Sequence, residues 1–204
     1  DLLQAASWSV TDSLPYDSTY LDGKFGAWLE GNAVVTPDGN VADLLRVDYA
    51  PGPEYAALIR LRDSVSFDPF DPEKDFVRMP GGAKKFTVRY DSLSGRYWSL
   101  VNYVTQEWAG KQNPAWVRNT LALSSSPNLQ EWTVHRTVLH HPDIAKHGFQ
   151  YADWLFDGND IVLLSRTAYD DNGTGAHNCH DANYMTFHRI KDFRKALTEQ
   201  AGNR

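Results

Sequence analysis

The sequence predicts an all-β fold of the β-propeller type, and three observations support this prediction. Runs rich in β-branched and aromatic residues, which favour strands, dominate the chain. Three pairs of such runs flank short turns that each contain an Asp and a Gly, the pattern of β-hairpins. Each hairpin is followed by one or two further strand-like runs, so a unit of about four short strands recurs, as in propeller blades.

The predicted hairpins turn at residues 37–40, 91–95 and 157–160. Further strands are predicted over 56–61 and 65–67 after the first hairpin, over 120–124 and 132–139 after the second, and over 184–189 after the third. Trp8 and Trp132 lie in similar contexts, two units of about 60 residues apart. A β-sandwich is the alternative fold, but it does not predict hairpin turns at a fixed period.

The chain is interpreted as one incomplete propeller domain over residues 1–204. Its predicted parts are an outer strand of a preceding blade with a linker (1–20), three blades (21–70, 80–139 and 147–194) and a surface tail (195–204). Three blades do not close a ring, because propellers usually have about four to eight. A missing N-terminal half or a second copy of the chain is therefore expected to complete the propeller, since an open arc exposes apolar blade faces.

Composition excludes several classes of function. The net charge of −6 and the lack of a basic run argue against a nucleic-acid surface. No apolar stretch reaches the length of about 18 residues that a membrane-spanning helix needs. Cys179 is the only cysteine, so an intrachain disulfide is impossible. Aromatic residues make up 13% of the chain, which suits strands and also the binding of sugar rings.

Four groups of residues carry the most specific signal, and each lies at the edge of a strand-like run. In chain order they contain Glu30, Arg46, Arg118 and Tyr151. A carboxylate, two guanidinium groups and a phenol suit chemistry on an anionic sugar, because the planar fork of Arg pairs with a carboxylate through two hydrogen bonds. Asn32, which follows Glu30 closely, is a further candidate for substrate binding.

The layout of these groups resembles the C-terminal half of the sialidase (neuraminidase) superfamily of six-bladed propellers. The resemblance rests on Glu30 and Arg46 on either side of a Pro-Asp-Gly turn, on an Arg-Asn pair before the strand 120–124, and on Tyr151 before an Asp-Gly turn and an apolar strand. It implies a glycoside hydrolase that removes a terminal acidic sugar with retention, using Tyr151 as nucleophile, Glu30 as its base, and Arg46 and Arg118 as a clamp for the sugar carboxylate.

The physical logic of these roles is independent of the resemblance. Sialic acid carries a carboxylate on its anomeric carbon, and that group repels a carboxylate nucleophile. A neutral phenol avoids this repulsion, provided that a nearby base removes its proton, because free Tyr has a pKa near ~10. Each residue also has a structural interpretation: Glu30 as a surface acid, Arg46 as an ion-pair partner, Arg118 as a loop cap and Tyr151 as a core aromatic.

A second cluster spans residues 177–183 and contains His177, His180 and Asp181. We expect this loop to lie at the mouth of the central channel, where these three residues contact substrate; a structural loop held by its own hydrogen bonds is the alternative. His and Cys are zinc ligands, but the spacing here is not a standard one. The sequence therefore predicts no metal and no cofactor, and its expected partner is a carbohydrate.

Two other functions stay open. Five histidines (residues 140, 141, 147, 177 and 180) together with Tyr151 also suit a lyase or hydrolase of uronic-acid polysaccharides, which holds a uronate carboxylate with the same arginines. A non-catalytic carbohydrate-binding propeller is the third possibility, because the Asp-box at 124–132 lacks its Asp and Gly. The compartment cannot be read from the sequence, although secretion or a periplasmic location is expected for the parent protein.

Overall fold

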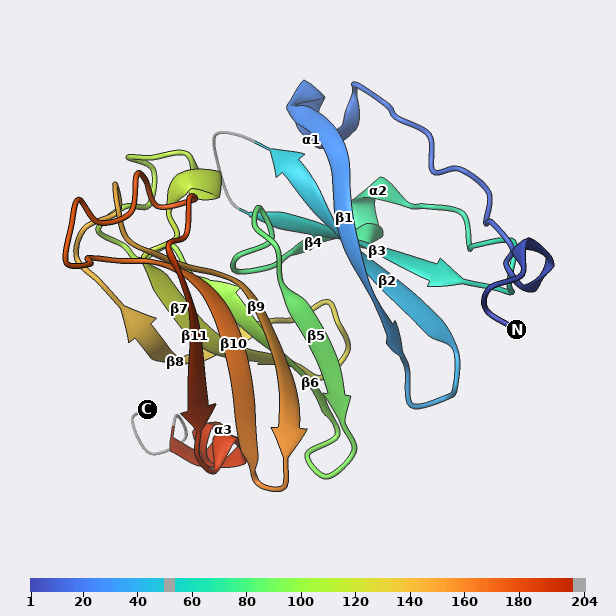
Figure 1. Cartoon of the computed structure of the whole chain (residues 1–204). Coiled ribbons are helices and arrows are strands. Elements are labelled where there is room, and N and C mark those ends of the chain that lie inside the picture. Colours follow the sequence, from blue (N-terminus) through green and yellow to red (C-terminus); the bar gives the residue numbers. More distant parts are fainter. Residues whose placement is uncertain (50–53, 200–204) are drawn as a thin grey trace.

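The computed structural model describes residues 1–49 and 54–199, which form three antiparallel sheets joined by loops (Figure 1). The first sheet has the order β1 (Phe25–Val35), β2 (Val41–Tyr49), β3 (Tyr55–Leu61), β4 (Phe76–Arg78). The second has the order β5 (Thr87–Asp91), β6 (Arg96–Asn102), β7 (Thr120–Ser126), β8 (Thr133–His140). The third contains β9 (Gly148–Asp157), β10 (Asp160–Ala168) and β11 (Tyr184–Ile190).

Helical structure within the described ranges is limited to single turns. The α-helical turns are α1 (Tyr20–Gly23), α2 (Pro72–Asp75) and α3 (Ala196–Glu199), and 3₁₀ turns occur at Ala5–Ser7, Pro114–Trp116 and Phe193–Lys195. None of these helices is long and apolar enough to cross a membrane. The prediction of an all-β fold built from propeller blades is confirmed.

The three predicted hairpins form because their turns contain glycines in the left-handed region. Gly39, Gly95 and Gly158 have φ values of 84°, 64° and 62° in the β1–β2, β5–β6 and β9–β10 turns. Glycine adopts such angles at no steric cost because it lacks a Cβ. All three turns lie at the same end of the molecule, and the loops β6–β7, β8–β9 and β10–β11 lie at the other end (Figure 1).

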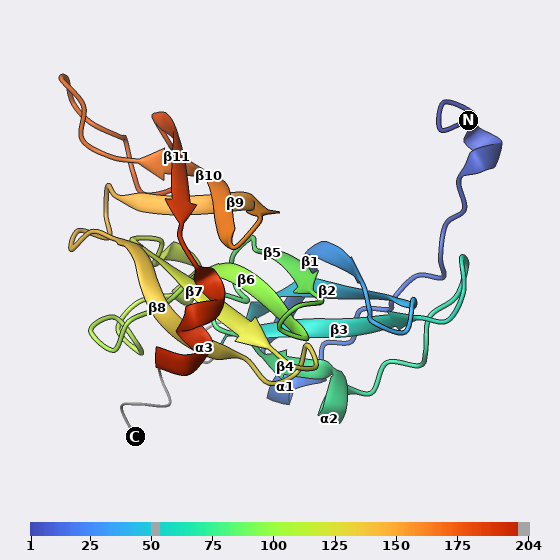
Figure 2. The same cartoon turned by 90° about the horizontal axis from the view of Figure 1, so that it is seen from below.

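The first strands of the three sheets, β1, β5 and β9, lie side by side around a common axis (Figures 1 and 2). Side chains join them where main chains do not pair. The side-chain oxygen of Asn32 accepts a hydrogen bond from the Val88 amide at 3.0 Å, and the indole of Trp154 donates to the Thr87 carbonyl at 3.0 Å. Each sheet is therefore one blade, and we call them the first, second and third blade.

Each pair of neighbouring blades packs together through an apolar core. Between the first and second blades pack buried side chains that include Leu44, Met79 and Phe86, and between the second and third pack others that include Trp98 and Trp154. All residues of β7 are buried, because the second blade has a neighbour on both faces. On the third blade, by contrast, the face away from the second blade leaves apolar side chains exposed, namely Leu155, Leu164 and Phe187.

Three details of the predicted blades are wrong. The fourth strand of the first blade is β4, whereas the run 65–67 contributes only an isolated bridge between Leu61 and Phe67. The predicted limit of this blade at residue 70 therefore excluded its last strand. The predicted surface tail (195–204) is not at the surface at its start, because Ala196 is 1% exposed. Residues 200–204 of the predicted tail lie outside the described residues.

The N-terminal segment was predicted to contain a strand of another blade, but the structure places no residue of 1–20 in a strand. Ala5–Ser7 form a 3₁₀ turn, and Trp8 is 65% exposed. Further along, Leu14 and Tyr20 pack against an aromatic cluster on the first blade that includes Phe25. Residues 14–21 thus cover part of the outer face of that blade. Whether the start of the segment pairs with a further blade stays a prediction.

Phe193 anchors the C-terminal turn to the second and third blades. Its ring meets the Trp98 ring edge-on at 5.0 Å and stacks on Phe156 at 5.2 Å. Next to it, Arg194 donates two hydrogen bonds to Asp91, at 2.8 and 2.6 Å. These contacts close the outer end of the core between the two blades.

We expect Phe193→Ala to lower the free energy of unfolding by about 3–5 kcal/mol, since it leaves a cavity against two rings. Urea denaturation followed by tryptophan fluorescence measures the change. Leu93→Ala is the matched control: Leu93 is 78% exposed in the β5–β6 turn, and its truncation should cost about 0.5 kcal/mol or less. Equal losses in the two variants would contradict the anchoring role of Phe193.

Candidate active site

Two β-bulges mark the candidate active site. On β1, Leu29 and Glu30 together oppose the single residue Arg46 of β2, because the register shifts between Trp28 and Gly31. On β9, Tyr151 and Ala152 oppose Ser165 of β10, because the register shifts again between Leu164 and Arg166. A bulge re-aims side chains and is common next to active sites. Both residues predicted to be catalytic, Glu30 and Tyr151, therefore lie at bulges.

Glu30 and Arg46 form an ion pair across the first bulge. Nη1 of Arg46 lies 2.5 Å from the Glu30 carboxylate, and its Nη2 donates to the Ala83 carbonyl at 2.8 Å. Burial by itself raises the pKa of Glu30, but the hydrogen bond from its own amide and the charges of Arg46 and Lys85 outweigh this, so the pKa lies below its ordinary value. The Glu30 side chain is half exposed and is held as a carboxylate.

Arg118 is buried between the second and third blades. Its Nε donates to the Ala115 carbonyl at 3.0 Å and its Nη1 to the side-chain oxygen of Gln150 at 2.8 Å. Burial lowers the pKa of Arg118, and the nearby Tyr151 opposes this shift. The guanidinium carbon lies 5.9 Å from the centre of the Tyr151 ring.

Tyr151 has an unusual backbone conformation. Its φ is 51°, in the left-handed region that non-glycine residues rarely occupy. A second guanidinium group, that of Arg166 on β10, lies 4.8 Å from the centre of the ring. The phenol oxygen lies 3.4 Å from Nε2 of His180. The β9 bulge thus directs this phenol towards two cations and an imidazole.

A buried ion pair, Lys84 with Glu54, interacts electrostatically with Arg46 and Arg118. Lys84 is fully buried, and its Nζ contacts the Glu54 carboxylate at 2.5 Å and the Pro114 carbonyl at 2.8 Å. Burial lowers the pKa of Lys84; Glu54 opposes the shift, whereas the charges of Arg118 and Arg46 add to it. The charges of Lys84, Arg46 and Arg118 therefore act on one another, and together they favour an anion nearby.

The loop from residue 169 to 183 brings His180 to Tyr151. The His180 carbonyl accepts a hydrogen bond from Gln150 Nε2 at 2.6 Å, which ties the loop to β9. Asp181 lies behind the imidazole, with a carboxylate oxygen 3.4 Å from Nδ1 of His180. Hydrogen bonds from His180 and Asn178 lower the pKa of Asp181. His177 is exposed in the same loop and interacts with Asp181 through charge.

Asn32 and Tyr151 line one pocket of about 430 Å³ that crosses β1, β5 and β9. Lys85 and Arg89 also line it, together with Asp153, which pairs with Arg89 at 3.2 Å, so the pocket is polar and contains charges of both signs. The side chain of Asn32 is occupied in joining β1 to β5, where its nitrogen donates to the Val88 carbonyl at 3.3 Å. Asn32 therefore shapes the wall of this pocket.

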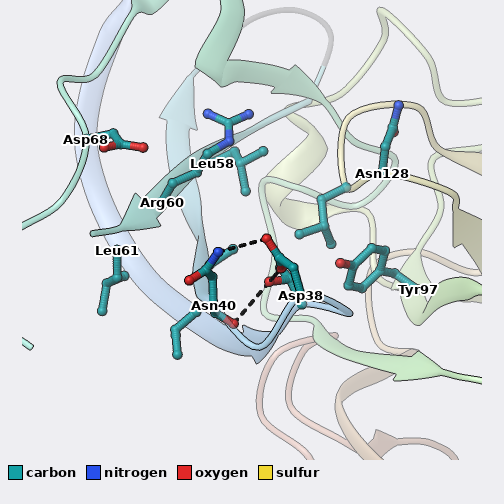
Figure 3. Close-up of a pocket in the computed structure, with 12 residues that line it drawn as sticks. Asp38, Asn40, Leu58, Arg60, Leu61, Asp68, Tyr97 and Asn128 are labelled. Atoms are coloured by element: carbon teal, nitrogen blue, oxygen red, sulfur yellow. Dashed lines mark hydrogen bonds between the residues drawn. The ribbon is translucent and has the colours of Figure 1, made fainter. Parts of the chain in front are cut away.

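A second pocket, of about 230 Å³, lies at the hairpin-turn end of the first two blades (Figure 3). Asp38, Arg60 and Tyr97 are among the residues that line it. Both of its acidic groups are already engaged, since the Asp38 carboxylate accepts a hydrogen bond from Asn40 at 2.7 Å and Asp68 pairs with Arg62 at 3.2 Å. None of the predicted site residues lines this pocket, so it is separate from the candidate active site.

Only some of the predicted site residues thus contact one another. Arg118, Tyr151 and His180 form one group, while Glu30 is linked to it only through Arg46, whose charge acts on Arg118. Sequence reasoning missed Lys84, Gln150 and Arg166. A signal existed for two of them: Gln150 directly precedes Tyr151, and Arg166 interrupts the apolar run of β10.

No protein-family model matches the chain, and no curated protein matches it. Solved structures do. An α-L-arabinanase from Penicillium chrysogenum complexed with arabinobiose is 11% identical, with a TM-score of 0.52 over 87% of this chain and 49% of that one. An α-L-arabinofuranosidase from Fusarium graminearum, bound to an iminosugar inhibitor, is 9% identical, with a TM-score of 0.50 over 87% and 48%.

The chain has a propeller-type β-fold. A leech intramolecular trans-sialidase also matches, at 16% identity and a TM-score of 0.47 over 84% of this chain and 24% of that one, a likeness too low to carry an argument. At such identities the likeness shows the fold alone. The chain spans about half the length of the two fungal enzymes.

We expect Lys84→Met to lower the free energy of unfolding by about 3–5 kcal/mol, because it leaves the Glu54 carboxylate buried without its cation. Lys84→Met combined with Glu54→Gln should recover part of this loss, since no uncompensated charge remains. The control is Lys74→Met in the exposed pair of Lys74 with Asp71, where about 1 kcal/mol or less is expected. Chemical denaturation of the four proteins checks this; a loss at Lys84 no greater than at Lys74 contradicts the assigned role.

Proposed function

We propose that this chain is part of a glycoside hydrolase that removes a terminal acidic sugar, sialic acid or a related one, from glycans. Tyr151 is the nucleophile, Glu30 its base, and Arg46 and Arg118 bind the sugar carboxylate. Asn32, His177, His180 and Asp181 line the sugar-binding region. The β-propeller fold, which it shares with two fungal glycosidases, supports a carbohydrate-active enzyme at the level of analogy.

The conformation of Tyr151 carries this proposal. A non-glycine residue at φ 51° costs about 1–3 kcal/mol and persists only where its surroundings over-determine it. Such strain is concentrated at active sites. Here the strained residue supplies a phenol whose ring lies near Arg118 and Arg166. The two guanidinium groups attract the negative charge that appears on the phenol oxygen when a base removes its proton, before the oxygen attacks the sugar.

The buried cations supply the second part of the argument. Arg46 and Arg118 are both less than a tenth exposed, and Lys84 lies with them. Within the described residues, two carboxylates, Glu30 and Glu54, contact this group directly. A sugar carboxylate that binds Arg46 competes with Glu30 for the guanidinium. Binding of substrate thus releases Glu30 to act as a base.

A second candidate is favoured by one observation, the 3.4 Å approach of the Tyr151 phenol to His180. A lyase of uronic-acid polysaccharides uses a Tyr and a His as acid and base at the carbon next to the carboxylate. The same arginines neutralise the uronate. In this mechanism Glu30 serves only as the ion-pair partner of Arg46.

We expect Tyr151→Phe to lower kcat by about 100-fold or more while leaving carbohydrate binding intact. The variant is made in the native protein and assayed in the oligomeric state in which that protein purifies. Removal of the hydroxyl leaves both guanidinium contacts with the ring. Tyr16→Phe is the matched control, because Tyr16 lies in the N-terminal segment, outside the candidate site, and is exposed. Turnover by Tyr151→Phe equal to that of the parent protein rules out the nucleophile role, and binding without turnover in the parent itself indicates a non-catalytic propeller.

Glu30→Gln and His180→Gln separate the two candidates. A hydrolase with Glu30 as base should lose about 100-fold in kcat with Glu30→Gln and less with His180→Gln. A lyase should show the reverse order and release an unsaturated product that absorbs in the ultraviolet. Product spectra and reducing-end assays on sialosides and on uronic-acid polysaccharides give the answer.

A further inference from the structure

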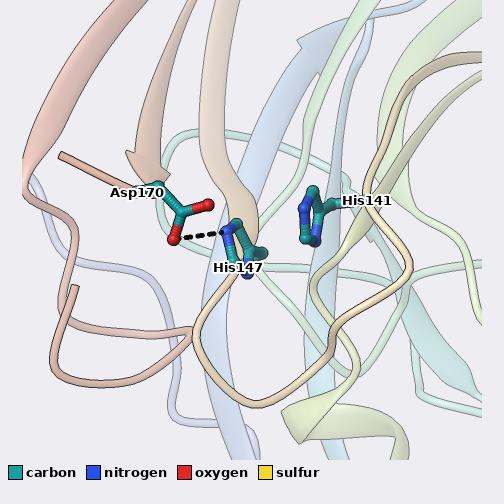
Figure 4. Close-up of side chains that lie close together, drawn as sticks. All are labelled: His141, His147 and Asp170. Atoms are coloured by element: carbon teal, nitrogen blue, oxygen red, sulfur yellow. Dashed lines mark ion pairs between the residues drawn. The ribbon is translucent and has the colours of Figure 1, made fainter. Parts of the chain in front are cut away.

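Three polar side chains from two loops, none of them among the predicted site residues, lie close together (Figure 4). His141 and His147 flank the loop between β8 and β9, and Asp170 lies just after β10. One potential ligand atom from each of the three lies within 4.8 Å of the others. Two imidazoles and a carboxylate are the ligand types that zinc and other divalent transition metals select.

His147 supplies the decisive observation. The residue is only 5% exposed, and its Nε2 is buried without a hydrogen-bond partner within the described residues. Its Nδ1 lies 2.8 Å from a carboxylate oxygen of Asp143. A carboxylate only accepts, so Nδ1 carries a proton, and in the neutral ring Nε2 then presents its lone pair. Nε2 points at the Asp170 carboxylate, 3.4 Å away (Figure 4).

This arrangement matches how metal-binding histidines are held. A ligating imidazole usually donates its second N–H to a carboxylate, which fixes the tautomer and raises the basicity of the ligating nitrogen. Asp143 does this for His147. Asp143 is itself fixed by the loop, because its carboxylate accepts hydrogen bonds from the amides of Ala145 and Lys146 at 2.8 and 3.1 Å.

We propose that His141, His147 and Asp170 bind a divalent transition metal ion of the zinc class, with Asp143 orienting His147. The Asp170 side chain is 75% exposed, so solvent reaches the ion and can fill the fourth position. This proposal concerns other histidines than the loop 177–183 and replaces the sequence-based expectation of no metal with a specific site.

Binding requires one rearrangement, at His141. The rings of His141 and His147 stack at 3.5 Å with an angle of 18°, and Nδ1 of His141 accepts a hydrogen bond from the Asp143 amide at 3.1 Å. Zinc ligands lie about 2.0–2.2 Å from the ion and converge on it, which two stacked rings do not do. The partly buried His141 ring must therefore turn out of the stack, and the exposed Asp170 must move inward.

The ion would join the loop before β9 to the loop after β10. The second of these loops carries His180, which lies next to Tyr151. The two loops already meet where the Cys179 amide donates to the Ala145 carbonyl at 2.7 Å. Metal binding is therefore expected to slow amide hydrogen exchange in residues 169–183.

The alternative without metal is an imidazolium, with His147 protonated and paired with both Asp143 and Asp170. The two cases differ in their response to pH and to metal. Metal binding is lost as pH falls and protons displace the ion. The imidazolium case instead shows no specific metal affinity.

The test is a calorimetric titration of the tag-free, chelator-treated native protein with Zn²⁺, together with the visible spectrum of bound Co²⁺. We expect one ion per chain. Asp170→Asn should weaken binding about 10-fold or more, and Asp143→Asn about 10–100-fold, the usual effect of removing an orienting carboxylate. Glu107→Gln, which removes an exposed acid from another loop, is the control and should bind Zn²⁺ like the parent protein.

Failure of the parent protein to bind Zn²⁺ or Co²⁺ specifically at neutral pH would overturn the proposal. Equal affinity in the parent and in Asp170→Asn would overturn it as well, because the ion would then be held elsewhere. Both substituted acids keep their shape as amides, so circular dichroism and the unfolding midpoint of the variants show directly whether a loss of binding reflects misfolding. The outcome does not depend on the proposed glycosidase activity.

Discussion

Burial of three cations in one region is the constraint on which the candidate site depends. Arg46, Lys84 and Arg118 are removed from water between the blades, and their charges act on one another. Such a group is stable only with anions or good acceptors nearby. The chain supplies Glu54, Glu30 and main-chain carbonyls, and the loops and bulges are arranged around this requirement. The remaining positive potential makes the region receptive to an anionic ligand.

The fold could be predicted from local features of the sequence, because each hairpin turn needs glycine and each blade needs runs of β-branched and aromatic residues. The β4 strand was not predictable in the same way: it is three residues long and follows a stretch rich in Asp and Pro. The burial of Phe193 was equally hidden, since the charged residues around it suggested solvent on all sides. Its environment is made by two blades that are distant in sequence.

The candidate site shows the same division. Glu30, Arg46, Arg118 and Tyr151 could be selected because each is a polar group at the edge of an apolar strand. The meeting of Glu30 with Arg46 follows from the spacing of the β1–β2 hairpin, because it continues the register of Gly31 with Leu45. The approach of Tyr151 to His180 does not follow from spacing, because it depends on the β9 bulge and on a loop that is distant in sequence. Lys84 was missed because a lysine next to another lysine suggests solvent, whereas the fold buries it.

The left-handed backbone of Tyr151 places stability and function in opposition at one residue. Glycine at this position would relax the backbone and remove the phenol, so the most stable sequence for this bulge is not the one that is present. The left-handed backbone raises the free energy of the folded state. The contacts of Tyr151 with Arg118, Arg166 and His180 hold the residue in this conformation. A search for thermostable variants guided by stability alone would therefore be drawn to residue 151 and would erase the group on which the proposed chemistry depends.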